Sequence, residues 1–267
     1  MEIKNIIAIH GFMFSKPNER SLDNANIDFR PQIESLVDQP VQLYQWYSAN
    51  FSIHLREIQY GLYNAAKVWG KSWLSGHLDP YSFSYKDLAP SVVPDFVRTL
   101  KDNYAKNNEK IIIIAHSLGS RIAILSAAQV PDLIDRMIIF NGAEIVDVAL
   151  PIVKDFTFPV LNIADKRDDI LADFGANFSG NGIHKRCIGS KGLGFGSPSN
   201  WTDIIIDDYK TITAAAKRGW TIEGDIDGFI GQFTEDHFYS YRNIGNANLI
   251  RAWLSGDDLS DLKSIYQ

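Results

Sequence analysis

Short apolar runs recur along the chain and alternate with segments whose apolar residues follow helical spacing. The apolar runs predict strands near residues 3–9, 41–46, 110–115, 134–140 and 158–164, and one or two further strands within 183–188 and 202–207. The helical spacing predicts helices near residues 31–38, 91–106, 119–129 and 246–255. Because strands and helices alternate, we expect an α/β fold with a mostly parallel central sheet and helices on both faces.

The most informative stretch is residues 111–120, which read Ile-Ile-Ile-Ile-Ala-His-Ser-Leu-Gly-Ser. Four β-branched residues predict a strand buried on both faces, and helical spacing follows it. A strand that turns sharply into a helix around a serine is the context of the nucleophile elbow, G-x-S-x-G. Ala115 and Gly119, two positions before and after Ser117, are small enough for that turn, with Ala115 in place of the usual first glycine. A serine here is also a common helix N-cap, and that interpretation stays open at this point.

Together with the start of the chain, this segment resembles the α/β-hydrolase superfamily of serine esterases and lipases. The predicted strand at residues 4–9 runs directly into His10-Gly11-Phe12, as the strand before the oxyanion loop does in that family. The resemblance implies that the backbone N–H groups of Phe12 and Leu118 form the oxyanion hole. The side chains expected beside the substrate pocket are those of His10, Met13 and His116.

The family places its acid after a later strand, and the resemblance points to an aspartate just beyond the strand predicted at residues 158–164. Asp168 fits the family spacing, because an aliphatic pair follows it after one residue. Asp169 is the neighbour that would take the same role, and Asp165 is a weaker third candidate. An aspartate after a strand is also a common turn or cap residue, so the assignment depends on the resemblance.

The family's histidine comes after the acid, and His237 has the expected position. It lies beyond the last predicted strand and before the amphipathic helix predicted near residues 246–255. His184, closer to the acid, is the alternative. The resemblance thus implies a triad in which Ser117 is the nucleophile, His237 the base and Asp168 the orienting acid. This chemistry needs no metal and no organic cofactor.

The activity that the resemblance implies is cleavage of a carboxylic ester, or a related acyl bond, in a small molecule through an acyl-enzyme. The same triad also serves thioesterases and acyltransferases, so these stay alternatives. A non-catalytic binding protein on the same fold is less favoured, because every triad residue type is present. The sequence leaves acyl-chain length, physiological substrate and oligomeric state open.

We expect one domain over residues 1–267, with two departures from a minimal fold. The chain enters the oxyanion strand directly, so we expect the family's two N-terminal antiparallel strands to be absent. Within residues 47–94, apolar residues at helical spacing predict a helical cap or insertion, or alternatively a long helix packed on the sheet. The glycine-rich segment 175–200 suggests either a mobile loop near the site or a plain surface loop.

Charge and composition exclude several classes of partner. The net charge is −6 without a basic run, which disfavours a nucleic-acid partner. The single Cys187 excludes a disulfide within the chain. No apolar stretch approaches the length of a membrane span, and a strand begins within a few residues of the start. We therefore expect a cytoplasmic protein.

Overall fold

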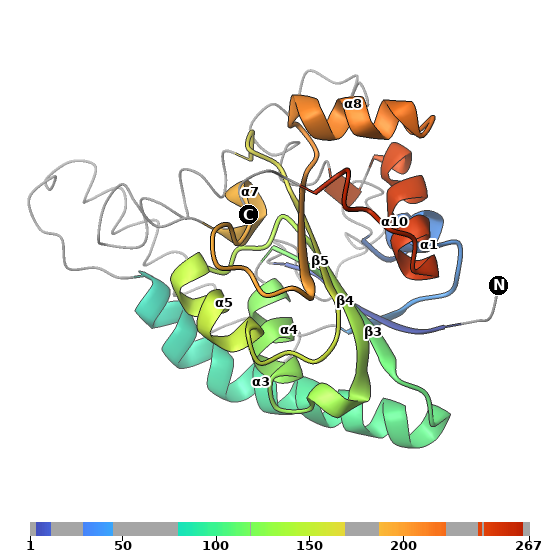
Figure 1. The fold of residues 1–267 in the computed structure, drawn as a ribbon. Helices are drawn as coiled ribbons and strands as arrows, with labels where there is room; N and C mark the ends of the chain where they lie inside the picture. Colours follow the sequence, from blue (N-terminus) through green and yellow to red (C-terminus); the bar gives the residue numbers. More distant parts are fainter. Residues whose placement is uncertain are drawn as a thin grey trace, which may run out of the picture.

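The computed structural model describes residues 4–11, 29–44, 80–117, 119–168, 187–222, 240–241 and 243–263, and the structural statements below concern these residues. They contain a six-stranded sheet in the order β2-β1-β3-β4-β5-β6, in which every neighbouring pair is parallel (Figure 1). The strands are β1 (Asn5–Ile9), β2 (Gln42–Tyr44), β3 (Ile111–His116), β4 (Ile134–Phe140), β5 (Val160–Ala164) and β6 (Trp201–Ile205). This sheet confirms the predicted α/β fold.

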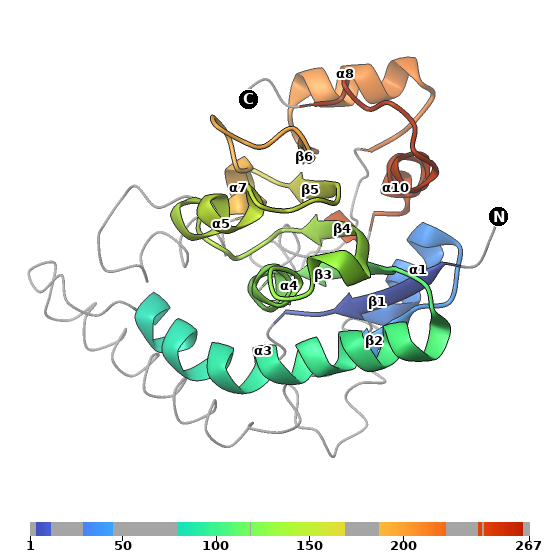
Figure 2. The same ribbon diagram turned by 60° about the horizontal axis from the view of Figure 1, so that its bottom comes forward.

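Helices cover both faces of the sheet, as Figure 2 shows. The helices are α1 (Phe29–Val37), α3 (Pro80–Asn107), α4 (Gly119–Ala127), α5 (Val146–Val153), α7 (Ile188–Lys191), α8 (Tyr209–Lys217) and α10 (Ala247–Ser255). On one face, α3, α4 and α5 pack against the strands, and on the other face α1, α8 and α10 do so. None of the helices in the described ranges is long and apolar enough to cross a membrane.

The central strands are apolar throughout because they are buried on both sides. All six residues of β3 are buried, and successive side chains enter opposite cores. Ile113 packs in one cluster with Phe96 of α3, whereas its neighbour Ile114 packs in the other with Leu249 of α10. Burial of each isoleucine side chain contributes roughly 1.5–3 kcal/mol, so the pattern that predicted the strand also stabilises it.

The strand register brings several chain segments to one edge of the sheet. Ala115 of β3 pairs with Ile9 of β1, and Phe140 of β4 pairs with both His116 and Ile163. The residues that follow β1, β3, β4 and β5 therefore emerge together at the carboxyl edge. In open α/β sheets this edge is where ligands usually bind.

The predicted elements agree with most of the observed ones. The helix expected near residues 91–106 is the second half of α3, and the strand expected within 202–207 is β6. Cys187 makes only an isolated bridge with Ile145, and α7 begins at the next residue, so residues 187–188 add no strand to the sheet. We had not predicted α5, in which apolar residues and Pro151 obscure helical spacing, or α8.

Only the end of the predicted cap, 47–94, falls within the described part of the chain. Residues from Pro80 onward belong to α3, and the apolar stripe that motivated the cap lies outside the described residues. The cap and the single-domain organisation therefore stay predictions.

The described part of the glycine-rich segment, residues 187–200, is anchored to the core. The buried carboxylate of Asp203 in β6 accepts hydrogen bonds from the backbone N–H groups of Leu193 (2.9 Å) and Gly194 (3.2 Å). Its other oxygen accepts from Asn162 Nδ2 (2.8 Å) and Trp201 Nε1 (2.7 Å). Four donors on one buried carboxylate fix this part of the loop to β5 and β6.

Candidate active site

Ser117 lies at a sharp turn between β3 and α4. It is buried, and its φ of 52° is in the left-handed region that residues other than glycine rarely adopt. Helix α4 begins two residues later at Gly119, where an added Cβ would lie 2.6 Å from the carbonyl oxygen of His10 and 2.7 Å from that of Ile9. Only a glycine lets α4 start this close to the end of β1. The turn therefore has the strand-to-helix geometry that the sequence motif predicts.

The segment after β1 reaches the Ser117 side chain. A Cβ added at Gly11 would lie 2.4 Å from Ser117 Cβ and 2.9 Å from Ser117 Oγ. The His10-Gly11 pair and the serine, about a hundred residues apart in sequence, are thus neighbours, as the resemblance implies. Phe12, Met13 and Leu118 lie outside the described residues, so their roles in the oxyanion hole and the pocket stay predictions.

The turn after β4, residues 140–143, holds the backbone of Ser117; we call it the β4 turn. Ser117 N donates a hydrogen bond to the Phe140 carbonyl oxygen (3.1 Å), and Ala143 N donates to the Ser117 carbonyl oxygen (3.1 Å). The Ser117 carbonyl also accepts from the backbone N–H (3.0 Å) and the hydroxyl (2.6 Å) of Ser120. Bonds on both sides of the residue fix its unusual backbone conformation.

Asp168 lies just beyond β5 and is fully buried. Its Oδ2 accepts a hydrogen bond of 2.7 Å from Asn141 Nδ2, which belongs to the β4 turn. Its backbone N–H donates to the carbonyl oxygen of Asp165 (3.2 Å). The carboxylate of Asp168 is therefore held at the carboxyl edge of the sheet, toward the strand that neighbours β3.

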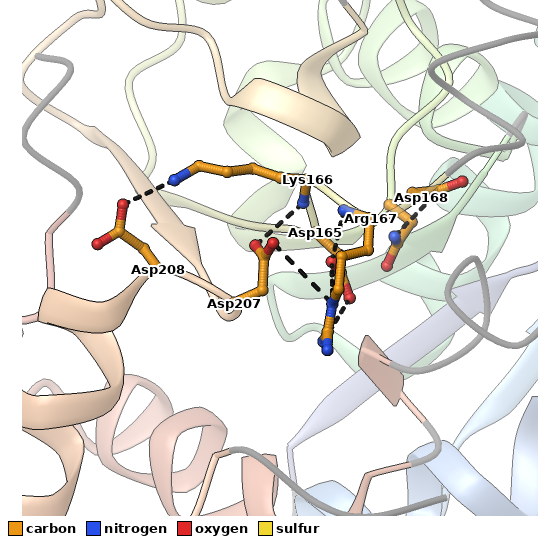
Figure 3. Close-up of polar contacts among 7 residues, drawn as sticks. Asp165, Lys166, Arg167, Asp168, Asp207 and Asp208 are labelled. Carbon is orange, nitrogen blue, oxygen red and sulfur yellow. Dashed lines mark hydrogen bonds and ion pairs between the residues drawn. The ribbon is translucent and has the colours of Figure 1, made fainter.

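Asp165, the weaker candidate acid, has different partners. Its Oδ1 accepts from the backbone N–H of Arg167 (2.9 Å), and the Arg167 guanidinium forms an ion pair with it (3.3 Å). Figure 3 shows this pair directed away from the Asp168 carboxylate. Burial raises the pKa of Asp165 to about 6, although Arg167 opposes the shift. These contacts bind the Asp165 carboxylate to Arg167 in the turn after β5, and Asp169 lies outside the described residues.

Residues 240 and 241, which precede the last helix α10, also lie at this edge of the sheet. The Ser240 hydroxyl donates a hydrogen bond to Asn141 Oδ1. The Tyr241 ring lies edge-on to the ring of His116, with centroids 4.7 Å apart, and also contacts Phe140. The two candidate bases, His237 and His184, are outside the described residues, but Ser240 is only three positions beyond His237.

Sequence reasoning missed a buried ion pair behind the serine turn. Arg121 of α4 and Glu144, which follows the β4 turn, are both buried, with Arg121 Nε 3.3 Å from Glu144 Oε2. Glu144 Oε1 also accepts from the backbone N–H of Ile145 (2.7 Å). Burial raises the pKa of Glu144. The sequence offered one signal for this pair: Arg121, four residues beyond Ser117, is a charged residue on a mostly apolar helix.

Asn141 was also missed. A polar residue directly after a strand is usually a turn residue, so its position gave no specific signal.

Within the described ranges, no group of histidine, cysteine, aspartate and glutamate residues could hold a metal ion.

His10 is buried beside the serine, with its Nδ1 2.5 Å from the Gly11 carbonyl oxygen. Burial lowers the pKa of His10 from 6.5 to about 4, so the folded protein keeps the ring neutral at mildly acidic pH.

The low pKa of His10 predicts a loss of stability on acidification. At pH 5.5 the unfolded chain protonates this histidine and the folded protein does not, so His10 lowers the free energy of unfolding by about 1 kcal/mol relative to pH 7.5. His10→Gln removes the titrating group, and urea unfolding at the two pH values measures the difference. We expect the variant to lose less stability than the wild type; equal losses would show that the pKa of His10 is not lowered.

A family model described as serine hydrolase matches residues 58–165, which are 108 of the 267 residues. The matched segment includes Ser117 and ends at Asp165, before Asp168 and His237. The match supports a hydrolase activity. A comparison with curated protein sequences returns no significant match.

Several solved structures have a similar arrangement at low sequence identity. A predicted CIB-like hydrolase from Thermoplasma acidophilum is 14% identical with a TM-score of 0.36, over 76% of this chain and 74% of that one. Est1E from Butyrivibrio proteoclasticus is 12% identical with a TM-score of 0.38, over 94% and 89% of the two chains. MenH from S. aureus is 12% identical with a TM-score of 0.40, over 96% and 94%.

Proposed function

We propose that the chain is a serine hydrolase that cleaves a carboxylic ester or a related acyl bond in a small molecule, because a serine hydrolase family model matches residues 58–165 and the parallel sheet agrees with the α/β-hydrolase fold that the sequence resembles. Ser117 attacks the acyl carbon while His237 takes its proton, and Asp168 holds the imidazole and stabilises the imidazolium. The imidazolium then protonates the departing alcohol, which leaves an acyl-enzyme. Water, deprotonated by His237, releases the acid and restores Ser117.

The observation that carries this proposal is the placement of Ser117. It occupies a left-handed turn at the carboxyl edge of the sheet, and Gly11 lies against its hydroxyl. A helix N-cap alone does not require either feature, because cap residues normally adopt extended backbone conformations. Strained backbone held by hydrogen bonds on both sides is typical of functional sites.

Chain connectivity supports the assignment of His237, which the family order suggests. Three residues of extended chain span at most about 11 Å, which limits how far His237 can lie from Ser240. Ser240 in turn contacts Asn141, whose amide contacts Asp168. This connection from Ser240 to Asp168 supports His237 as the base. The oxyanion donors in this mechanism are the N–H groups of Phe12 and Leu118.

Substitution of the nucleophile tests the proposal directly. Ser117→Ala removes the attacking hydroxyl, so we expect kcat/KM on a short p-nitrophenyl ester to fall at least about 1000-fold. Ser126→Ala is the matched control, because Ser126 is a fully buried serine on α4, the helix that follows Ser117, and we expect this variant to keep wild-type activity. A Ser117→Ala enzyme with full activity would overturn the assignment.

Esterase and thioesterase activity can be separated with a panel of substrates. We would measure kcat/KM of the wild type and of Ser117→Ala on esters of increasing chain length and on the matching thioesters. Turnover of thioesters alone would favour the second activity.

The two candidate acids predict different effects of the same substitution. Asp168→Asn removes the charge that stabilises the imidazolium, so we expect kcat to fall by about 1000-fold or more. Asp165→Asn alters a turn carboxylate that is bound to Arg167, and we expect kcat to fall less than about tenfold. Steady-state kinetics on both variants, with thermal unfolding as a check on folding, decides between them. The reverse order of effects would make Asp165 the acid.

A further inference from the structure

The side chain of Asn141 joins two parts of the chain that the proposed mechanism requires to act together. It is fully buried in the β4 turn. Its Nδ2 donates to Asp168 Oδ2 (2.7 Å), 27 residues further along the chain, and its Oδ1 accepts from the Ser240 hydroxyl, 99 residues further along. Asn141 therefore touches the candidate acid and also the segment that follows the candidate base.

The chemistry of the two partners fixes the orientation of the amide. An ionised carboxylate only accepts hydrogen bonds, so the NH2 group must face Asp168 and the carbonyl oxygen must face Ser240. Aspartate would present a second carboxylate to Asp168, and an aliphatic residue would remove both of these hydrogen bonds. The pair of contacts thus requires a side chain with one donor end and one acceptor end.

The backbone at Asn141 is fixed as firmly as its side chain. Its φ is 44°, a conformation that asparagine tolerates better than most residues. Its N–H donates to the Ile163 carbonyl oxygen of β5 (3.0 Å). Gly189 of α7 packs so closely that an added Cβ would lie 2.2 Å from the Asn141 carbonyl carbon and from Gly142 N. The amide group is therefore presented from a rigid support.

We propose that Asn141 is a positioning residue, which sets the Asp168 carboxylate relative to the segment that bears His237. The inference rests on the proposed triad and deepens it. Because the neighbouring residues of the β4 turn hold the backbone of Ser117, one turn fixes the geometry of nucleophile, acid and base-bearing segment. Asn141 is buried and acts on the reaction through Asp168 and Ser240.

A double-mutant cycle measures whether Asn141 acts through Asp168. Asn141→Gly removes the amide and suits the positive φ, and we expect it to lower kcat about 10- to 100-fold with KM nearly unchanged, because a displaced acid misaligns the base. In an Asp168→Ala background, where the acid is already lost, the same substitution should lower kcat less than about threefold. Losses that multiply in the double variant would overturn the inference.

Ser240→Ala tests the second contact and alters only one hydroxyl, so it remains informative if Asn141→Gly folds poorly. We expect it to lower kcat several-fold in the wild-type background and to have little further effect together with Asn141→Gly. Wild-type kcat for Ser240→Ala would contradict a role for this contact.

Asn200→Ala is the matched control for loss of a hydrogen-bonded asparagine. Asn200 Nδ2 donates to the carbonyl oxygens of Phe156 (2.7 Å) and Phe158 (2.8 Å), which precede β5 at the opposite edge of the sheet. We expect this variant to lower the unfolding temperature and to keep wild-type kcat. If Asn200→Ala lowered kcat as much as Asn141→Gly does, the effect of Asn141→Gly would be explained by a general loss of stability, and the inference would be wrong.

The outcomes separate this inference from the proposed function. If wild type hydrolyses esters and Ser117→Ala does not, while the Asn141 and Asp168 losses multiply, only the positioning role is wrong. If wild type hydrolyses neither ester nor thioester, the proposed function fails, and the role of Asn141 within it fails as well.

Discussion

The β4 turn is the constraint on which the rest of the site depends. Its main-chain groups bond to both sides of Ser117, and its Asn141 side chain bonds to Asp168 and Ser240. Each contact joins residues that are far apart in sequence, so none forms until the sheet has been assembled. The geometry needed for serine chemistry is therefore a product of the fold as a whole.

The parallel sheet brings these residues together. Strands that are buried on both faces have no polar side, so the polar and reactive side chains lie just beyond the carboxyl ends of the strands. The register aligns the ends of β1, β3, β4 and β5, and glycines allow the closest approaches, with Gly11 against Ser117 and Gly119 against the end of β1. At each of these glycines a methyl group would collide with main chain or with the serine itself.

The sequence predicted those parts of the fold whose signal is local. The isoleucine run of β3 is uninterrupted because both faces are buried, and Ser117 with Gly119 marks the turn that follows it. Asp168 was chosen because its spacing fits the family that the sequence resembles, and in the structure it lies at the carboxyl edge of the sheet, bonded to Asn141 of the β4 turn. Asn141 and the Arg121–Glu144 pair were not predictable, because their roles depend on partners that only tertiary contacts bring together. Helix α5 was not predicted for another reason: Val146, Ala149 and Val153 are buried, but the positions between them are also mostly apolar, and this obscures the helical periodicity.

The central claim is that Ser117 is a nucleophile activated by this arrangement. A fluorophosphonate probe reacts covalently with such a serine, and tryptic digestion should place Ser117 and Ser120 on one peptide, residues 111–121. Tandem mass spectrometry of the labelled native protein then locates the adduct. We expect it on Ser117, with no labelling after heat denaturation. An unlabelled protein, or an adduct on Ser120 or on any other serine, would contradict this account.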